Sequence, residues 1–215
     1  TEQSCLLRFY PGLEYRLGLG VAGMGKNGSL VSGDSHAFIH LRGGRFGLVL
    51  SDGMGAGPRA ALESGTTISL LRQLLESGFG QDLAVKTVNS ILILRSPGES
   101  FATVDLAVVN LYNGQAEFIK MEVVTLDGIL EDGDVLVLVT DGILDAYHGA
   151  GDREEWLVDI LMDVADLPPR DMAEIILKLA QTGAGGASRV PDDMTVMVAR
   201  LERQEEETVW KTAAI

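Results

Sequence analysis

Two short turn signals between apolar segments constrain the fold of this chain more than any other feature. They are Gly43-Gly44 and Asn113-Gly114. Glycine and asparagine tolerate the positive φ angles that tight hairpin turns require. The flanking segments predicted to be strands are Ser35–Leu41, Arg45–Leu50, Thr103–Tyr112 and Ala116–Met121. Hairpins of this kind favour antiparallel sheets over regular strand–helix alternation.

Two pairs of helices are predicted around these hairpins. Pro58 suits the first position of a helix and Gly78 suits its end. The predicted helices are Pro58–Gly78, Gln81–Leu94, Arg153–Ala165 and Pro169–Thr182. The remaining predicted strands are Glu14–Ala22, Asp134–Thr140 and Thr195–Leu201.

Two apolar runs indicate how these elements pack. Phe46–Leu50 and Val135–Val139 are apolar without alternation, which predicts that both faces of each strand are buried. Two antiparallel sheets packed face to face, each covered outside by one helix pair, would bury them. We therefore predict an α+β fold, an αββα sandwich, over residues 14–201. An N-terminal extension (1–13) and a C-terminal tail (202–215) flank it.

The composition excludes several classes of protein. The 215 residues carry a net charge of −14, so we expect no nucleic-acid partner. The single cysteine, Cys5, cannot form an internal disulfide, which favours a reducing cytoplasmic setting. The sequence has no signal peptide and no apolar run of about 18 residues, so we expect this segment to make no direct membrane contact. A membrane anchor elsewhere in a longer protein stays open.

A repeated phrase marks the candidate site. Leu48–Gly53 and Leu138–Gly142 both end an apolar strand with a hydroxyl residue, an aspartate and a glycine. An Asp-Gly after a strand is commonly only a turn. Two copies after buried strands are harder to explain as surface turns, because a surface turn does not need a buried strand before it. Asp52 and Asp141 are thus the first candidate residues.

Two further acids are expected at the same end of the sheets. If Arg42 and Arg45 flank a two-residue turn, Asp34 lies opposite Gly53 and one step from Asp52. The segment Pro191–Thr195 places acids at the start of the last strand, beside the ends of its antiparallel neighbours. Four acidic positions therefore converge at one pole of the sandwich.

Crowded carboxylates repel one another unless a cation neutralises them. Hard divalent cations prefer oxygen ligands, and a glycine beside an aspartate lets a backbone carbonyl approach the metal. The sequence has no cluster of His or Cys, which disfavours zinc and favours manganese or magnesium. Two such ions about 3.5–4 Å apart can generate a hydroxide and hold a phosphoryl group. The pattern favours hydrolysis of a phosphate monoester.

The motifs around Asp34 (Ser-Gly-Asp-Ser), Asp52 (Ser-Asp-Gly-Met-Gly), Asp141 (Thr-Asp-Gly-Ile) and Asp192 (Asp-Asp-Met-Thr) resemble the PPM, or PP2C-like, family of protein serine/threonine phosphatases. Within that family the chain most resembles the phosphatase domain of the bacterial stage II sporulation protein E. The resemblance runs from about Tyr15 to Leu201.

The resemblance implies the αββα sandwich, two Mn²⁺ or Mg²⁺ ions with Mn²⁺ favoured, and hydrolysis of a protein phosphoester. Asp52 would bridge both metals and the Gly53 carbonyl would bind one. Asp141 and Asp192 would hold the other, with Asp34 completing the site directly or through water. Asp52 and Asp141 are the expected catalytic residues. Asp192 is preferred to Asp193 because the first acid of that motif is the family's usual ligand.

The resemblance also implies biological partners. The expected substrate is a phosphorylated anti-sigma-factor antagonist that controls a sporulation sigma factor. The expected location is a cytoplasmic domain, with a larger membrane-anchored bacterial protein and a homodimer both left open. A stress-response regulator is an alternative role.

Some residues depart from the family pattern. Met54 stands where eukaryotic relatives have a histidine, and no clear phosphate-binding arginine precedes Asp34. After Met121 the chain runs directly into Glu122, without the family's Gly-Ser-x-Pro hairpin, so we expect a spatial break at this join. These departures leave open a catalytically weak, phosphatase-like module that binds a phosphoprotein.

Two nucleotide-binding motifs fail on their context. Gly18–Gly23 matches a dinucleotide fingerprint, but the glycine-rich stretch after it has no helical period. Gly20–Lys26 matches most of a P-loop, but Asn27 stands where that loop needs Ser or Thr.

Overall fold

The computed structural model describes residues 12–95, 102–120, 124–149 and 151–204, which form two sheets. The three-stranded sheet has the order β1-β8-β7, and the five-stranded sheet has the order β2-β3-β4-β5-β6. The strands are β1 (Tyr15–Met24), β2 (Asp34–Leu41), β3 (Arg45–Asp52), β4 (Asp105–Asn110), β5 (Gln115–Lys120), β6 (Val124–Ile129), β7 (Val135–Val139) and β8 (Met194–Arg203). Every strand pair described is antiparallel.

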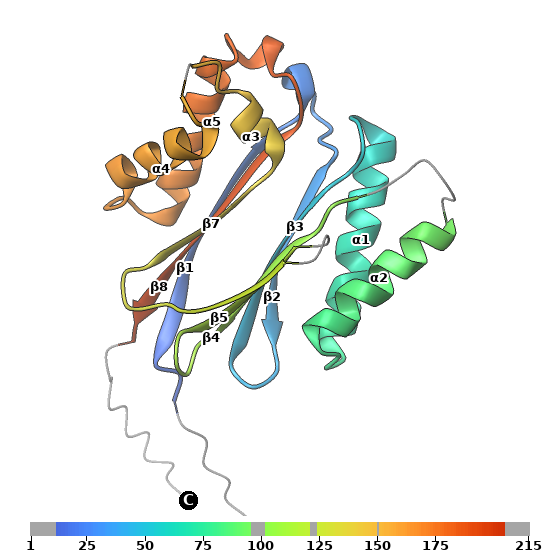
Figure 1. The fold of residues 1–215 in the computed structure, drawn as a ribbon, viewed down its shortest axis with the longest axis vertical. Helices are drawn as coiled ribbons and strands as arrows, with labels where there is room; N and C mark the ends of the chain where they lie inside the picture. The colour runs from blue at the N-terminus through green and yellow to red at the C-terminus, as the bar shows by residue number, and fades with distance from the viewer. Residues whose placement is uncertain (1–11, 96–101, 121–123, 150, 205–215) are drawn as a thin grey trace, which may run out of the picture.

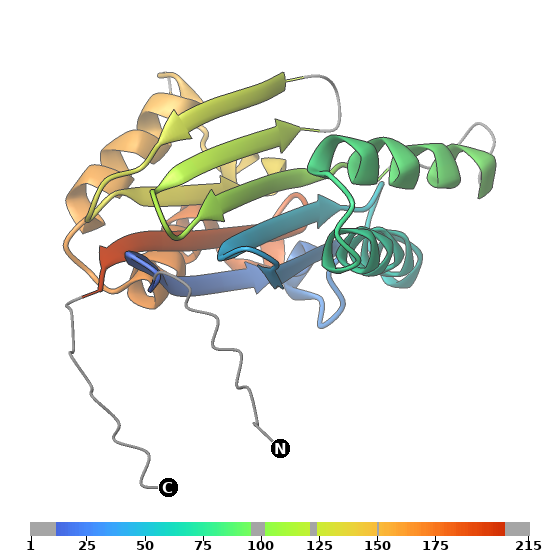
Figure 2. The same cartoon turned by 90° about the horizontal axis from the view of Figure 1, so that it is seen from below.

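Helices cover the outer face of each sheet (Figure 1). They are α1 (Pro58–Glu76), α2 (Gln81–Arg95), α3 (Asp141–Asp145), α4 (Arg153–Val164) and α5 (Pro169–Gly183). Figure 2 shows α1 and α2 on the side of the five-stranded sheet, with the later helices beside the other sheet. This arrangement confirms the predicted α+β fold, an αββα sandwich.

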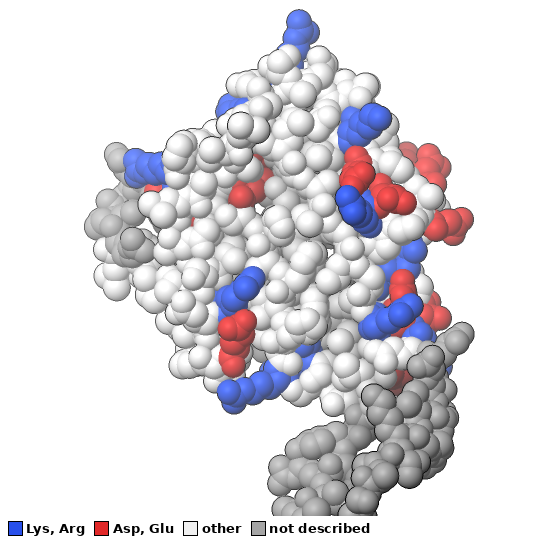
Figure 3. Space-filling model, turned by 180° about the vertical axis from the view of Figure 1, so that it is seen from behind, with Lys and Arg blue, Asp and Glu red and all other residues white. Residues whose placement is uncertain are grey.

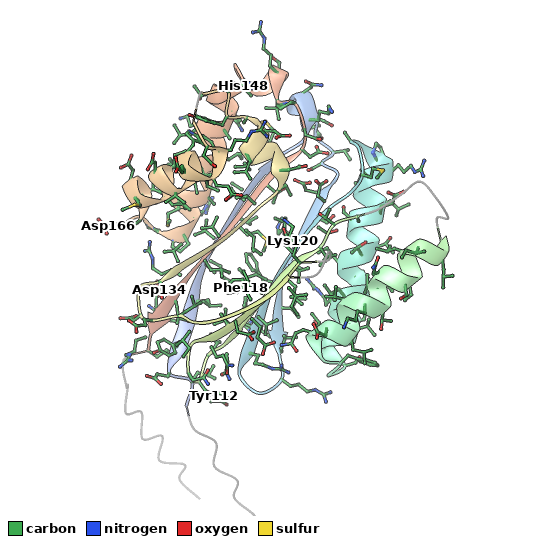
Figure 4. All side chains as sticks on the ribbon, in the orientation of Figure 1. Tyr112, Phe118, Lys120, Asp134, His148 and Asp166 are labelled. Atoms are coloured by element: carbon green, nitrogen blue, oxygen red, sulfur yellow. The ribbon has the colours of Figure 1, made fainter. Side chains whose placement is uncertain are left out.

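The central layer of the core lies between the two sheets. Leu48 and Leu50 of β3 pack there with Met197 and Leu201 of β8, and all four side chains are buried. Phe118 of β5 projects into the same layer (Figure 4). Full burial of one such side chain stabilises the fold by roughly 1.5–3 kcal/mol. This layer therefore holds the sheets in a fixed relation at the site described below.

The hairpin between β2 and β3 differs by one residue from the sequence prediction. Its turn contains Arg42, Gly43 and Gly44, and both glycines have positive φ angles of 73° and 67°. Leu41 therefore pairs with Arg45, and Asp34 pairs with Asp52 rather than with Gly53. The predicted two-residue turn was wrong, and the correction places the two carboxylates directly opposite one another.

Two other features differ from the sequence prediction. Every residue from Phe46 to Leu50 is buried as predicted, but in β7 only Leu136 is fully buried. The reason is that β7 pairs only with β8 and forms the edge of its sheet. The short helix α3, which begins at Asp141, was not predicted because five residues are too few to establish a helical period.

The surface carries its charges mostly as neighbouring groups of opposite sign on the face seen in Figure 3. Among the described residues, Arg16 pairs with Glu202 at 2.9 Å, and Arg170 pairs with Glu174 at 3.1 Å. None of the described helices combines the length and the apolar character needed to cross a membrane.

Candidate metal centre

The four predicted acids come from strand ends and from loops at one pole of the sandwich, the upper end in Figure 1. Asp34 opens β2 and Asp52 closes β3, and the two are partners in the register of the hairpin. Asp141 follows β7 as the first residue of α3, and Asp192 lies just before β8. Since β7 and β8 are antiparallel neighbours, the end of one meets the start of the other.

Asp34 is held by the protein through one of its two carboxylate oxygens. Its Oδ2 accepts a hydrogen bond of 2.9 Å from the hydroxyl of Thr140, the residue before Asp141. Its Oδ1 is buried and has no hydrogen-bond partner among the described residues. The pKa of Asp34 is raised to about 6, mainly by burial and also by the negative charge of Asp193, although hydrogen bonds with Thr195 and Thr140 partly oppose the rise.

Asp52 is half-buried and surrounded by negative charge. Burial, followed by the charges of Asp34, Asp141 and Asp192 in that order, raises the pKa of Asp52 to about 8. The other three acids therefore act electrostatically on Asp52. A positive ion among them would relieve this repulsion.

Asp192 and Asp193 are adjacent but have different environments. Asp193 is 2% exposed, and its two carboxylate oxygens accept hydrogen bonds of 2.8 Å from the backbone N–H groups of Lys26 and Gly33. It thus fastens both ends of the loop between β1 and β2. Asp192 is half-buried, and its Oδ1 lies 3.9 Å from the Lys26 ammonium and accepts a hydrogen bond from its neighbour's N–H. Asp193 therefore stabilises the loop between β1 and β2. The carboxylate of Asp192 has fewer contacts and is the more available of the two to a metal ion.

The glycine after each repeated aspartate is required by packing. A Cβ atom on Gly53 would lie 2.3 Å from the backbone oxygen of Ala60 in α1. A Cβ atom on Gly142 would lie 2.0 Å from the backbone oxygen of Asp193. Neither distance is tolerable, so each glycine lets another segment of the site approach its aspartate closely.

The donor set can be compared with the needs of a metal ion. Among the residues that the structure describes, no three His, Cys, Asp or Glu side chains form a group that could hold an ion as they stand. The chemistry nonetheless fits a hard divalent cation, because the donors are oxygens and the buried Asp34 Oδ1 has no partner in the part of the chain that the structure describes. An ion would have to draw in Asp141, which is exposed, and Asp192.

Several contributors to this pole were not found from the sequence alone. Thr140 occupies the hydroxyl position of the repeated phrase, but its bond to Asp34 could not be anticipated. The corresponding Ser51 is buried, and its hydroxyl has no partner in the described part of the chain. The roles of Asp193 and Lys26 depend on contacts distant in sequence. His148 lies on the loop after α3 and is exposed (Figure 4).

Comparison with known sequences identifies the family. The profile of the family Stage II sporulation protein E (SpoIIE) matches residues 42–126 and 120–202. The chain belongs to this family. It is 33% identical to stage II sporulation protein E of Priestia megaterium, over 87% of this chain and 37% of the relative. The chain thus spans little more than a third of that relative's length.

Solved structures agree with this family. A structure of the PP2C phosphatase domain with a fragment of the regulatory domain of SpoIIE from Bacillus subtilis superimposes with a TM-score of 0.82. The identity is 29%, and the match covers 90% of this chain and 66% of that chain. The catalytic domain of the phosphatase PstP in complex with two manganese ions has the same fold, with a TM-score of 0.62 at 18% identity, over 87% of this chain and 99% of that chain. The SpoIIE-family chain is therefore a PP2C-type domain.

The family match divides at residues 120–126, around the unusual join at Met121-Glu122. The alignment with the Priestia megaterium protein has 218 positions but covers only about 187 of the 215 residues here. About 31 positions of the alignment thus lack a residue in this chain. The join itself lies outside the described residues, so the expected spatial break stays a prediction.

Proposed function

We propose that this domain is a metal-dependent protein serine/threonine phosphatase. The observation that carries the proposal is the meeting of Asp34, Asp52, Asp141 and Asp192 at one pole of a SpoIIE-family PP2C fold, where burial and the charges of the other three acids raise the pKa of Asp52 to about 8. Such a cluster is destabilising without a cation.

The proposed ligands are the four carboxylates and the Gly53 carbonyl. Asp52 would contact both of two Mn²⁺ or Mg²⁺ ions, and Asp141 and Asp192 would hold one of them, with Asp34 completing the set. The two manganese ions named for PstP, which shares the fold, support this assignment. When bound, two such ions lower the pKa of a water molecule and polarise the phosphoryl oxygens.

The protein's own residues orient the site. The Thr140 hydroxyl fixes one oxygen of Asp34 and leaves the other free. Asp193 holds the β1–β2 loop against the segment that carries Asp192. Met54, which follows Gly53, is exposed and has no proton to donate. The leaving serine or threonine oxygen must therefore take its proton from a group other than the residue at this position.

The proposed substrate is a phosphorylated anti-sigma-factor antagonist, because the chain belongs to a family named for sporulation. We place the domain on the cytoplasmic side of a longer bacterial protein. Met54 favours one alternative, a weakly catalytic module that binds a phosphoprotein, because it replaces the histidine that eukaryotic relatives carry.

The experiment is a phosphate-release assay on the 215-residue chain. The substrate is the phosphorylated antagonist, and an unrelated phosphoprotein is the control. We expect release with Mn²⁺, none with a chelator, and none from Asp52→Asn. Binding of the phosphorylated antagonist without release under any metal condition would favour the binding module. Equal rates on both proteins would leave a phosphatase but reject the assigned substrate.

A further inference from the structure

Lys26 lies beside the metal centre but belongs to none of the four acidic motifs; it is the last residue of the P-loop match that fails at Asn27. It opens a short 3₁₀ turn (Lys26–Gly28) in the loop between β1 and β2. Its ammonium nitrogen lies 3.9 Å from Oδ1 of Asp192, and its side chain is 41% exposed. Among the described residues it is the only Lys or Arg that forms an ion pair with one of the four acids.

The backbone of Lys26 is fixed to the site. Its N–H donates to Oδ1 of Asp193 at 2.8 Å, and the N–H of Asn27 donates to the carbonyl of Val190 at 3.2 Å. Asn27 adopts a φ of 55°, which non-glycine residues seldom adopt. The loop therefore holds a specific conformation against the segment 190–193. The ammonium, at the end of a flexible stem and in contact with solvent, remains free to move.

The charge at this pole requires such a group. Two divalent cations would balance the four carboxylates and leave no excess positive charge for a phosphate ester, which carries nearly two negative charges. The chain as a whole, at −14, repels such a ligand. Arg59, in the first turn of α1, pairs with Glu63 at 3.1 Å rather than with one of the four acids. The arginine that would bind phosphate is missing before Asp34.

We propose that Lys26 is a phosphate-binding residue of this site. Its ammonium leaves Asp192 and contacts a phosphoryl oxygen of the substrate, so that Asp192 becomes available to a metal ion. Lysine suits this exchange because it is a compact point charge on a long stem. The inference rests on the proposed function, since it assigns a role toward that phosphate.

The test compares three variants of the 215-residue chain. Lys26→Met removes the charge and keeps most of the stem, and Lys26→Arg keeps the charge. The matched control is Arg189→Met, because Arg189 ends the neighbouring 3₁₀ turn (Ala187–Arg189) and its loss changes the net charge equally. The measurements are the KM for p-nitrophenyl phosphate, the inhibition constant of inorganic phosphate, and Mn²⁺ affinity by calorimetry without phosphate.

We expect Lys26→Met to raise the KM and the phosphate inhibition constant by about tenfold, while Mn²⁺ binds as tightly as before or more tightly. The Mn²⁺ affinity should not fall, and can rise, because the substitution removes a positive charge beside Asp192. Lys26→Arg should recover most of the phosphate binding, and Arg189→Met should resemble the unaltered chain.

Three results would overturn the inference. One is an unchanged phosphate inhibition constant in Lys26→Met. Another is parallel weakening of phosphate and Mn²⁺ binding with a lower melting temperature, which would make Lys26 structural. The third is an equal effect of Arg189→Met. If the unaltered chain shows no metal-dependent turnover, the proposed function fails, and calorimetric titration of inorganic phosphate into the Mn²⁺-bound variants still decides the role of Lys26.

Discussion

The hydroxyl of Thr140 donates a hydrogen bond of 2.9 Å to Oδ2 of Asp34, although the two residues are 106 positions apart. The same hydroxyl oxygen accepts a hydrogen bond of 2.8 Å from the N–H of Thr195. Thr140 follows β7, Thr195 lies in β8, and Asp34 opens β2 of the other sheet. One buried side chain therefore joins the two sheets at the pole where the acids meet.

Replacing Thr140 with valine should test this junction. Valine keeps the shape but leaves the Thr195 N–H without its side-chain acceptor and Asp34 Oδ2 without its Thr140 donor. A buried polar group without a partner costs about 1–3 kcal/mol. A loss of that size lowers the melting temperature by roughly 2–4 °C per kcal/mol in a domain of this size. Differential scanning calorimetry measures it.

Thr140→Ser provides the control, since it retains the hydroxyl. It should also retain most of the Mn²⁺ affinity, whereas Thr140→Val should weaken Mn²⁺ binding because Asp34 loses its fixed orientation. Equal melting temperatures and equal Mn²⁺ affinities in the two variants would contradict the role given to the hydroxyl.

The adjacent acids Asp192 and Asp193 should respond differently to the same substitution. Asp193→Asn places one N–H₂ group where a carboxylate oxygen accepts a backbone N–H, so it should destabilise the domain by about 1–3 kcal/mol. Asp192→Asn should leave the stability of the metal-free domain unchanged or improved, and should lower the Mn²⁺ affinity. Denaturant unfolding in a chelator and Mn²⁺ titration separate the two effects. The reverse assignment of the two effects would make Asp193 the ligand.

The fold could be predicted because its signals are local. Hairpins are indicated by Gly43-Gly44 and Asn113-Gly114, and the start of α1 is indicated by Pro58. These signals do not depend on contacts with distant parts of the chain. The strand-end phrase likewise places Asp52 and Asp141 where strands end. Once antiparallel sheets are established, the four acids must lie at one pole.

The remaining details depend on contacts between distant residues. The turn at Gly44 has three residues, and its carbonyl accepts a hydrogen bond of 2.8 Å from the N–H of Leu111. No local signal reveals that contact or the length of the turn, which sets the register. The edge position of β7 follows from the order of the strands, so it could not be predicted locally either. The same holds for the hydrogen bond between Asp193 and Gly33, which are distant in sequence.

Asp52→Asn should abolish metal-dependent hydrolysis and stabilise the domain in a chelator. In the folded state, burial and neighbouring charges raise the pKa of Asp52 from 3.8 to about 8. The folded state thus binds a proton that the unfolded state releases, and the metal-free domain loses stability as the pH rises from about 4 to 8. Asparagine carries no charge and escapes this loss.

The melting temperatures of the unaltered chain and Asp52→Asn, measured in a chelator across that pH range, check the prediction. The advantage of the variant should be small near pH 4 and should grow to a few degrees at pH 8, since Asp52 is only half-buried and water screens part of the repulsion. Asp163→Asn, on the exposed side of α4, removes the same charge away from the site. A variant that gains nothing over this control at pH 8 would contradict the crowding of the four acids.

Gly53→Ala should couple α1 to the metal centre. A Cβ atom at this position would lie 2.3 Å from the backbone oxygen of Ala60, so either the first turn of α1 or the end of β3 must move. Overpacking of this kind costs about 1–3 kcal/mol. Because the Gly53 carbonyl is a proposed ligand, the displacement should also lower Mn²⁺ affinity.

Gly65→Ala is the matched control, since its Cβ would meet only the Ser35 hydroxyl at 3.7 Å, and alanine favours the helix by up to about 1 kcal/mol. The control should melt at a higher temperature with unchanged Mn²⁺ affinity. If Gly53→Ala binds Mn²⁺ normally at a temperature where it is fully folded, the Gly53 carbonyl is not a ligand and the contact with Ala60 serves packing alone.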